Sequence, residues 1–144
     1  MKAIIDTDPA IKRNYELLIG IVGVGVVVAV TTIVLTENFT AFTNPRKYAS
    51  YIAIAPFPHE SGTSVRGATR VSKQGFRQAK ADLSISVLSA MSHDPELKEY
   101  FQRKKAEGKH AGTSLNAIKF KIVLRMFAVV KRGTPYVNTK GYKG

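Results

Sequence analysis

Residues 17–35 read LLIGIVGVGVVVAVTTIVL, an apolar stretch without a single charge. The stretch is long enough to span a membrane as one helix. Its three glycines, Gly20, Gly23 and Gly25, lie close together, however, and clustered glycines are more typical of a turn. The remaining valines and isoleucines suit a buried core as well as lipid. Hydropathy alone therefore leaves a small membrane protein spanning 17–35 and a soluble core equally well supported, and this stretch decides the fold.

The residues around this stretch favour two helices joined by a hairpin. Asp8-Pro9 is a good helix start, with the aspartate as N-cap and the proline at the first helical position. We expect that helix to run into Leu18, a tight turn over 20–25, and a second helix over 26–35. This helix-hairpin-helix-like layout, at about 8–36, would present the backbone N–H groups of Gly23 and Gly25 to a DNA phosphate. A glycine-kinked core helix is the alternative.

Capping residues and helical periodicity predict the remaining elements. Asn44-Pro45 starts a helix that should reach about Ala55, and Asp94-Pro95 starts another that should stop at Gly108. Thr113 or Ser114 can cap the last helix. The predicted buried faces recur at steps of three and four residues: Tyr48, Tyr51, Ile52 and Ala55; Phe76, Ala79, Leu83, Val87 and Ala90; Leu97, Tyr100 and Phe101; and Ile118, Ile122, Met126 and Val129.

The sum is a mainly α fold, a compact helical domain with one long basic loop. We expect the domain to cover 1–135, with the loop at about 56–75, a helical part at 76–132 and a polar tail at 136–144. Basic side chains on the last helix, Lys119, Lys121 and Arg125, should either extend outward to solvent or border a groove.

Composition limits the chemistry. The 144-residue chain carries a net charge of +12, which indicates a polyanionic partner, either nucleic acid or an anionic membrane surface. It has no cysteine, so disulfides, thiolate zinc sites and cysteine nucleophiles are excluded. The three histidines are scattered and the acidic residues show no motif spacing. We therefore expect no metal site in this chain.

The stretch Pro56–Gly67, PFPHESGTSVRG, carries the chemistry of the expected loop. Its prolines, glycines and small hydroxyl residues are typical of a turn. No acidic residue follows until Asp82, and the interval is basic, with Arg66, Arg70, Lys73, Arg77 and Lys80. A hydroxyl group in a turn beside a cluster of cations suits a phosphodiester partner.

Several ordered blocks of the sequence resemble the C-terminal domain of one transposase family. They are IVGVG at 21–25, FTAFTNPRKYA at 39–49, PFPHESG at 56–62 and VKRGTPYV at 130–137. Together they resemble the IS110 family of insertion sequences, also called the IS116/IS902 group, over nearly the whole chain from Asp8 to Val137. Ordered blocks of this kind are more specific than any single motif.

The resemblance implies that Ser61, the serine of the Pro-x4-Ser-Gly motif, is the nucleophile for DNA strand exchange. An alcohol needs a base or strong charge stabilisation to attack. Arg66 and Arg70 could hold the phosphoryl oxygens, and Gly62 permits close approach of the backbone to phosphate. Lys73, Arg77 and Lys80 would bind the DNA backbone. The general base stays open among His59, Glu60 and Lys73, Ser64 is a helper or has no role, and in isolation Ser-Gly-Thr-Ser is simply a turn.

The resemblance also implies partners. Full-length members carry an N-terminal RuvC-like nuclease domain that binds metal, and a structured guide RNA directs recombination. We expect this chain to be a C-terminal fragment with no cofactor of its own, Mg²⁺ belonging to the N-terminal domain. DNA, guide RNA, that domain or the full-length transposase, and a second copy are the expected partners, with no membrane and a cytoplasmic, nucleoid-associated location.

Three positions depart from the family pattern: Val22 and Val26 each replace a usual proline of the hairpin, and Ala53 replaces a common glycine. Such changes also fit a rival hypothesis, a non-catalytic basic remnant that binds nucleic acid and cuts nothing.

Overall fold

The computed structural model describes residues 5, 7–54 and 70–137, with residues 70–76 described by backbone only. Within these ranges the fold is mainly helical, as expected, and contains no strand. Its helices are α2 (Pro9–Ile19), α3 (Val26–Leu35), α4 (Pro45–Tyr51), α5 (Arg70–His93), α6 (Pro95–Ala106) and α7 (Ala111–Arg132).

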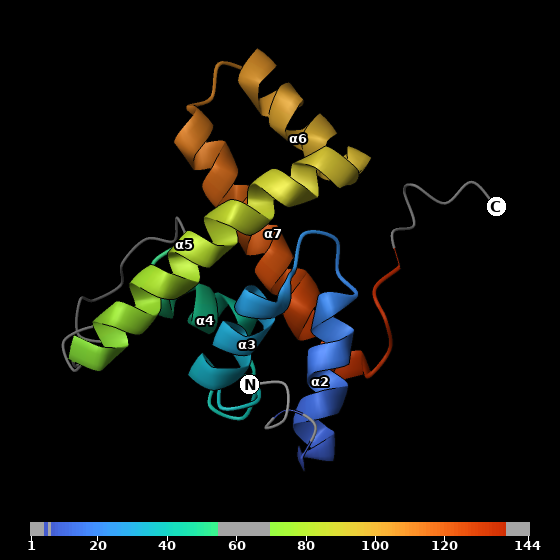
Figure 1. The fold of residues 1–144 in the computed structure, drawn as a ribbon. Helices are drawn as coiled ribbons and strands as arrows, with labels where there is room; N and C mark the ends of the chain where they lie inside the picture. Colours follow the sequence, from blue (N-terminus) through green and yellow to red (C-terminus); the bar gives the residue numbers. More distant parts are fainter. Residues whose placement is uncertain (1–4, 6, 55–69, 138–144) are drawn as a thin grey trace.

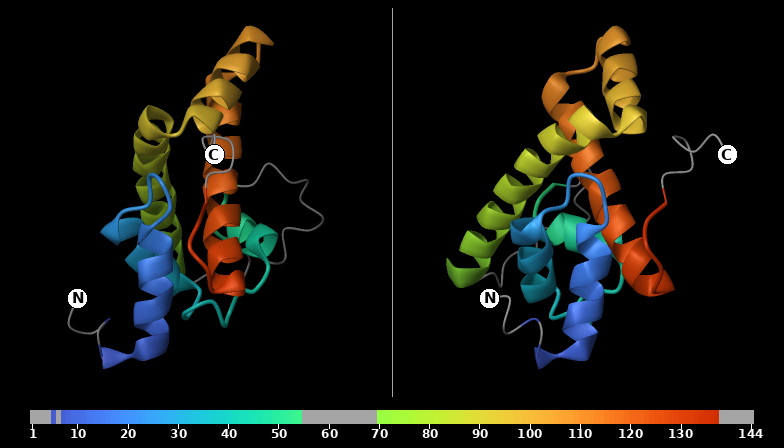
Figure 2. Two further views of the ribbon diagram at one scale, coloured as in Figure 1. Left: turned by 90° about the vertical axis from the view of Figure 1, so that its right-hand side faces the viewer. Right: turned by 45° about the vertical axis from the view of Figure 1, so that its right-hand side comes forward.

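Helix α7 is the central element. It packs against α2, α4, α5 and α6, while α3 lies on α5 and α2. Figure 1 shows the long helix α5 crossing α7, with α6 at the C-terminal end of α5. The two further views in Figure 2 show α6 and the start of α7 extending together beyond the rest of the molecule.

The apolar stretch at 17–35 does not form one continuous helix. Helix α2 ends at Ile19, a turn follows, and α3 begins at Val26. The turn holds backbone bonds from the N–H of Ile21 to Leu18 O (3.1 Å) and from the N–H of Val24 to Ile21 O (3.0 Å). Among the described residues no helix is both long and apolar enough to cross a bilayer. Two helices joined by a turn are therefore found where the sequence predicts them, in place of the single helix over 17–35 that the membrane-spanning alternative requires. The role of this element as a DNA-binding helix-hairpin-helix stays a prediction.

Three helices begin as their sequence predicts. Asp8, Asn44 and Asp94 are the N-caps of α2, α4 and α6, each followed by proline at the first helical position. The side chain of each cap accepts a hydrogen bond from a backbone N–H of the first turn, at 2.8–2.9 Å. These bonds satisfy donors that the helix itself cannot pair.

Three other predicted helix boundaries are wrong. Helix α4 stops at Tyr51 rather than near Ala55, because Ala53 adopts a left-handed backbone (φ 60°). Helix α5 begins at Arg70, so the expected loop at 56–75 extends too far. Gly75, at the expected end of that loop, lies inside α5, where a single glycine is tolerated. The cap of α7 is His110, whose Nδ1 accepts from the N–H of Gly112 at 3.0 Å, and not Thr113 or Ser114.

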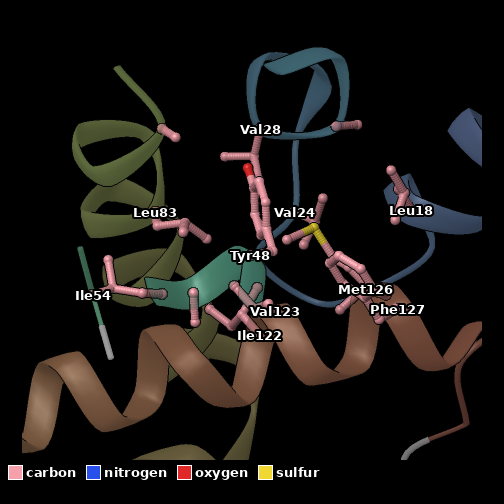
Figure 3. Close-up of a cluster of buried hydrophobic side chains, with 14 of the residues drawn as sticks. Leu18, Val24, Val28, Tyr48, Ile54, Leu83, Ile122, Val123, Met126 and Phe127 are labelled. Atoms are coloured by element: carbon pink, nitrogen blue, oxygen red, sulfur yellow. The ribbon is translucent and has the colours of Figure 1, made fainter. Parts of the chain in front are cut away.

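The core forms where α3, α4, α5 and α7 meet. Tyr48 of α4 lies at its centre, 1 % exposed, between Leu83 of α5 and Met126 of α7, as Figure 3 shows. The predicted inner faces are buried at Ala79, Leu83, Val87 and Ala90, at Leu97, and at Ile118, Ile122, Met126 and Val129. Burial raises the pKa of the Tyr48 hydroxyl well above its usual range. That group is therefore neutral at any physiological pH.

Candidate nucleic-acid interface

The first turns of α5 carry a row of four cations. Arg70, Lys73, Arg77 and Lys80 occupy positions i, i+3, i+7 and i+10 of one continuous helix. At roughly 100° per residue these register positions fall within an arc of about 80°. The side chains of Arg77 and Lys80 are exposed, whereas those of Arg70 and Lys73 lie outside the described part of the structure. The sequence analysis missed this alignment because it placed the first two cations in a loop.

The buried face of α5 lies beside this row of cations. Ala79 and Leu83 pack into the core on that face, so the row of cations borders the packed surface and faces solvent at Arg77 and Lys80. Side chains held on a rigid helix at one-turn intervals can follow a phosphate backbone. We call this row the α5 cation stripe.

The predicted nucleophile and its closest neighbours lie outside the described residues. They are Ser61, Gly62 and Arg66, together with His59, Glu60 and Ser64. Their chain positions place them directly before the α5 cation stripe. The predicted roles of these residues stay predictions.

The two hairpin glycines occupy different environments. Gly23 has φ +89°, and a β-carbon built there would lie 2.7 Å from both Ala90 Cβ and the carbonyl oxygen of Ser86. A glycine is therefore required at position 23 for packing against α5, whether or not this residue contacts DNA. Gly25 is the N-cap of α3 with extended backbone, and a β-carbon there would meet nothing within 4 Å.

The structure does not bring the hairpin and the α5 cation stripe together. Gly23 contacts α5 at Ser86 and Ala90, in the C-terminal half of the helix. Ala90 is thirteen residues beyond Arg77, which corresponds to about 20 Å along the helix axis. One nucleic-acid phosphate cannot contact both.

A lysine of α7, Lys119, lies near Lys80 of the stripe. Lys119 is only 8 % exposed, and its Nζ donates to Asn116 Oδ1 at 3.4 Å. Burial lowers the pKa of Lys119, and the charge of Lys80 lowers it further. The prediction that this side chain extends outward or borders a groove missed its burial, which depends on tertiary packing.

The neighbouring carboxylate, Asp82, has a structural role. It is 6 % exposed and accepts hydrogen bonds from Thr31 Oγ1 at 3.0 Å and from Gln78 Nε2 at 2.7 Å. The bond from Thr31 ties α3 to α5, and the bond from Gln78 lies within α5. Within the described ranges no group of three histidine, aspartate or glutamate side chains could hold a metal ion.

Comparison with known proteins identifies the family. Residues 15–102 match the family described as Transposase IS116/IS110/IS902. The chain belongs to this transposase family. The matched range includes the hairpin, the Pro-x4-Ser-Gly motif and the α5 cation stripe.

Curated relatives agree with the assignment to this family. The chain is 32% identical, over 79% of its length, to an uncharacterized 43.6 kDa protein of insertion element IS110 from Streptomyces coelicolor. It is 23% identical over 92% of its length to the pilin gene-inverting protein of Moraxella lacunata. It is 24% identical over 91% of its length to an uncharacterized 42 kDa protein of insertion element IS900 from Mycobacterium paratuberculosis. The matched regions cover only 28%, 42% and 34% of these three relatives.

Proposed function

We propose that this chain is the DNA-binding and strand-exchange part of a transposase, with Ser61 as the nucleophile. The observation that supports this most directly is the α5 cation stripe. Four cations with one-turn spacing follow the Pro-x4-Ser-Gly motif, within the range that matches the transposase family. Cations in such a row bind the backbone of DNA and bring a scissile phosphate to the residues just before the helix.

The proposed chemistry is a pair of transesterifications. The Oγ of Ser61 attacks the phosphorus of a phosphodiester, one phosphorus–oxygen bond to deoxyribose breaks, and a phosphoserine linkage forms. The serine proton passes to a general base, and the leaving deoxyribose oxygen takes up a proton. A hydroxyl end of another strand then attacks the phosphoserine, which restores both the Ser61 hydroxyl and a phosphodiester. Arg66 and Arg70 stabilise the charge that develops on the phosphoryl oxygens.

The chain on its own would bind and not recombine. It spans less than half of each of the three curated relatives described above. In this proposal an N-terminal nuclease domain with Mg²⁺ and a guide RNA complete the recombinase, which acts in the cytoplasm on the nucleoid. Multiple copies would assemble on the two DNA segments that exchange strands.

Covalent trapping tests the nucleophile. The chain is mixed with the N-terminal domain of a related full-length transposase, guide RNA and a labelled DNA substrate that carries a nick beside the exchange site. We expect a denaturant-resistant protein–DNA adduct that disappears in Ser61→Ala and persists in the matched control Ser64→Ala. An adduct that survives Ser61→Ala contradicts the proposal.

The alternative function is a non-catalytic nucleic-acid-binding module, in which the α5 cation stripe binds the phosphodiester backbone and no serine reacts. Absence of any adduct, with the N-terminal domain present and DNA binding intact, would support that alternative.

Salt dependence tests the stripe. Each phosphate contact contributes about 0.9 to the slope of log K against log salt for duplex DNA. Arg77→Gln together with Lys80→Gln should therefore lower that slope by about 2. A matched pair of substitutions on exposed cations elsewhere, Lys12→Gln with Lys131→Gln, should leave it nearly unchanged.

A further inference from the structure

The ring of Tyr100 on α6 is surrounded by cations from two helices. Arg103 Cζ lies 5.5 Å and Lys104 Nζ lies 5.7 Å from the ring centroid, and both belong to α6. Lys121 Nζ approaches to 4.8 Å from α7. The same place is a pocket lined by Glu96, Leu97, Tyr100, Arg103 and Lys121.

Two nearby carboxylates pair with cations, one of which belongs to this cluster. Glu107 pairs with Lys104 at 3.2 Å, and Glu96 lies 3.5 Å from Arg125. Among the residues that the structure describes, no carboxylate lies within 4.0 Å of Lys121 Nζ. The side chains that line the pocket include two cations, Arg103 and Lys121, and one carboxylate, Glu96, so the lining itself is net positive.

Helix-end electrostatics account for only two of the three cations around Tyr100. Arg103 and Lys104 lie in the last turn of α6, where cations interact favourably with the helix dipole. Lys121, in contrast, lies in the interior of α7, far from either helix end. Its position over Tyr100 beside two further cations costs electrostatic repulsion, which a bound anion would relieve.

We propose that Arg103, Lys104 and Lys121 around Tyr100 form a second binding surface for the phosphodiester backbone of a nucleic acid. We call it the α6–α7 basic surface. Arginine presents a fork of donors that matches two phosphate oxygens, and the lysines add point charges beside it. The tyrosine ring holds the cations in place and offers a face for stacking a base. Three cations from two helices fit the closely spaced phosphates of a nucleic acid better than a single phosphate ion.

This surface is separate from the α5 cation stripe. Helix α5 has 24 residues and is about 36 Å long, with the stripe in its first turns and α6 beyond its other end, as Figure 1 shows. The two surfaces therefore contact different phosphates. They bind either two sites about a turn of duplex apart or two nucleic acids, and the inference does not depend on the role of Ser61.

Equilibrium binding of the purified chain tests the proposal. Fluorescence anisotropy is recorded with a duplex DNA and with a hairpin RNA over a series of salt concentrations. The test variant is Arg103→Gln with Lys121→Gln, and the equal-charge control is Lys12→Gln with Lys131→Gln. We expect the test variant to bind at least one probe several-fold more weakly, with a salt slope reduced by about 1.4 to 1.8. The probe that loses more affinity identifies the nucleic acid that occupies the surface.

Two outcomes overturn the proposal. One is equal binding and equal salt slope in the test and control variants for both probes. The other is an unchanged affinity for nucleic acid together with lost binding to vesicles containing anionic lipid. Arg77→Gln with Lys80→Gln, measured in parallel, separates this inference from the proposed function, because that variant reports on the α5 cation stripe alone.

Lysine protection in the unmodified chain gives a result that does not depend on how the variants fold. Amine acetylation followed by mass spectrometry should show that either probe protects Lys104 and Lys121, while the exposed Lys12 and Lys131 react as before. Unchanged acetylation of Lys104 and Lys121 at saturating nucleic acid contradicts the proposal.

Discussion

Gly23 lies so close to Ala90 that a β-carbon on the glycine would be 2.7 Å from that of the alanine. The turn between α2 and α3 therefore packs directly on α5, with the carbonyl oxygen of Ser86 equally near. This contact fixes the two N-terminal helices on the helix that carries the α5 cation stripe. It also gives the glycine a packing role that is independent of any DNA contact.

Gly23→Ala should therefore destabilise the fold. Its φ of +89° is unfavourable for alanine, and the added methyl group meets backbone as well as a side chain. We expect a loss of at least about 2 kcal/mol of unfolding free energy, measured by urea denaturation with far-UV circular dichroism.

Gly25→Ala is the matched control, since that position has open space around it. Its cost should stay below about 1 kcal/mol, the difference between glycine and alanine at an N-cap. If Gly25→Ala keeps its stability but binds DNA more weakly, the hairpin contacts phosphate. Equal destabilisation by the two substitutions would contradict the packing role of Gly23.

Ala53 ends α4 in a conformation that favours glycine. The N–H of Ala53 bonds to Ser50 O at 3.1 Å and the N–H of Ile54 bonds to Ala49 O at 3.0 Å, the two hydrogen bonds of a Schellman motif. Ala53 has φ 60°, which costs alanine about 1 kcal/mol or more. We expect Ala53→Gly to raise the thermal midpoint, by an amount that corresponds to about 0.5–1 kcal/mol.

Ala81→Gly, at an exposed position inside α5, should instead lower stability by about 1 kcal/mol. Two substitutions of the same kind with opposite signs would separate the backbone effect from the loss of a methyl group. A destabilising Ala53→Gly would show that the alanine side chain contributes packing that outweighs its strain.

Local sequence signals predicted the positions of the helices, but they could not predict contacts between residues far apart in the sequence. Asp8-Pro9 and Asp94-Pro95 fixed helix starts because a cap acts within three residues of itself. The end of α4 was missed because Ala53 carries no glycine signal for its left-handed backbone. The charge of Lys80 acts on the buried Lys119 across 39 residues of sequence. The approach of Lys121 to Tyr100 likewise joins two helices that the sequence analysis treated one at a time.

Arg125 anchors α6 to α7 through a carboxylate that is fully buried. Its Nη1 donates to Asp94 Oδ2 at 2.7 Å, and the Asp94 side chain is 0% exposed. Arg125→Met leaves that charge without its cation in a buried place, so we expect a loss of about 3 kcal/mol or more in unfolding free energy. Chemical denaturation of the purified variant measures it.

The double-mutant cycle with Asp94→Asn is the control. Asparagine can still cap α6 and carries no charge, so Asp94→Asn should cost less than Arg125→Met, and the double variant should recover part of the loss. Strictly additive effects of the two substitutions would contradict a direct coupling between Asp94 and Arg125.

Lys119 makes stability depend on pH in the alkaline range. Burial, followed by the charge of Lys80, lowers the pKa of Lys119 in the folded chain below the ordinary lysine value of 10.5. Between those two pKa values the unfolded chain binds more protons at this lysine than the folded chain, so this contribution to stability rises with pH in that window. Below the window the charged lysine destabilises the fold by a constant amount.

Lys119→Met should therefore be more stable than the unmodified chain near neutral pH, and the difference should shrink as pH rises toward 10.5. Thermal unfolding midpoints across this range measure it, with the exposed Lys131→Met as control. A difference between Lys119→Met and the unmodified chain that stays constant across the alkaline range would contradict the lowered pKa.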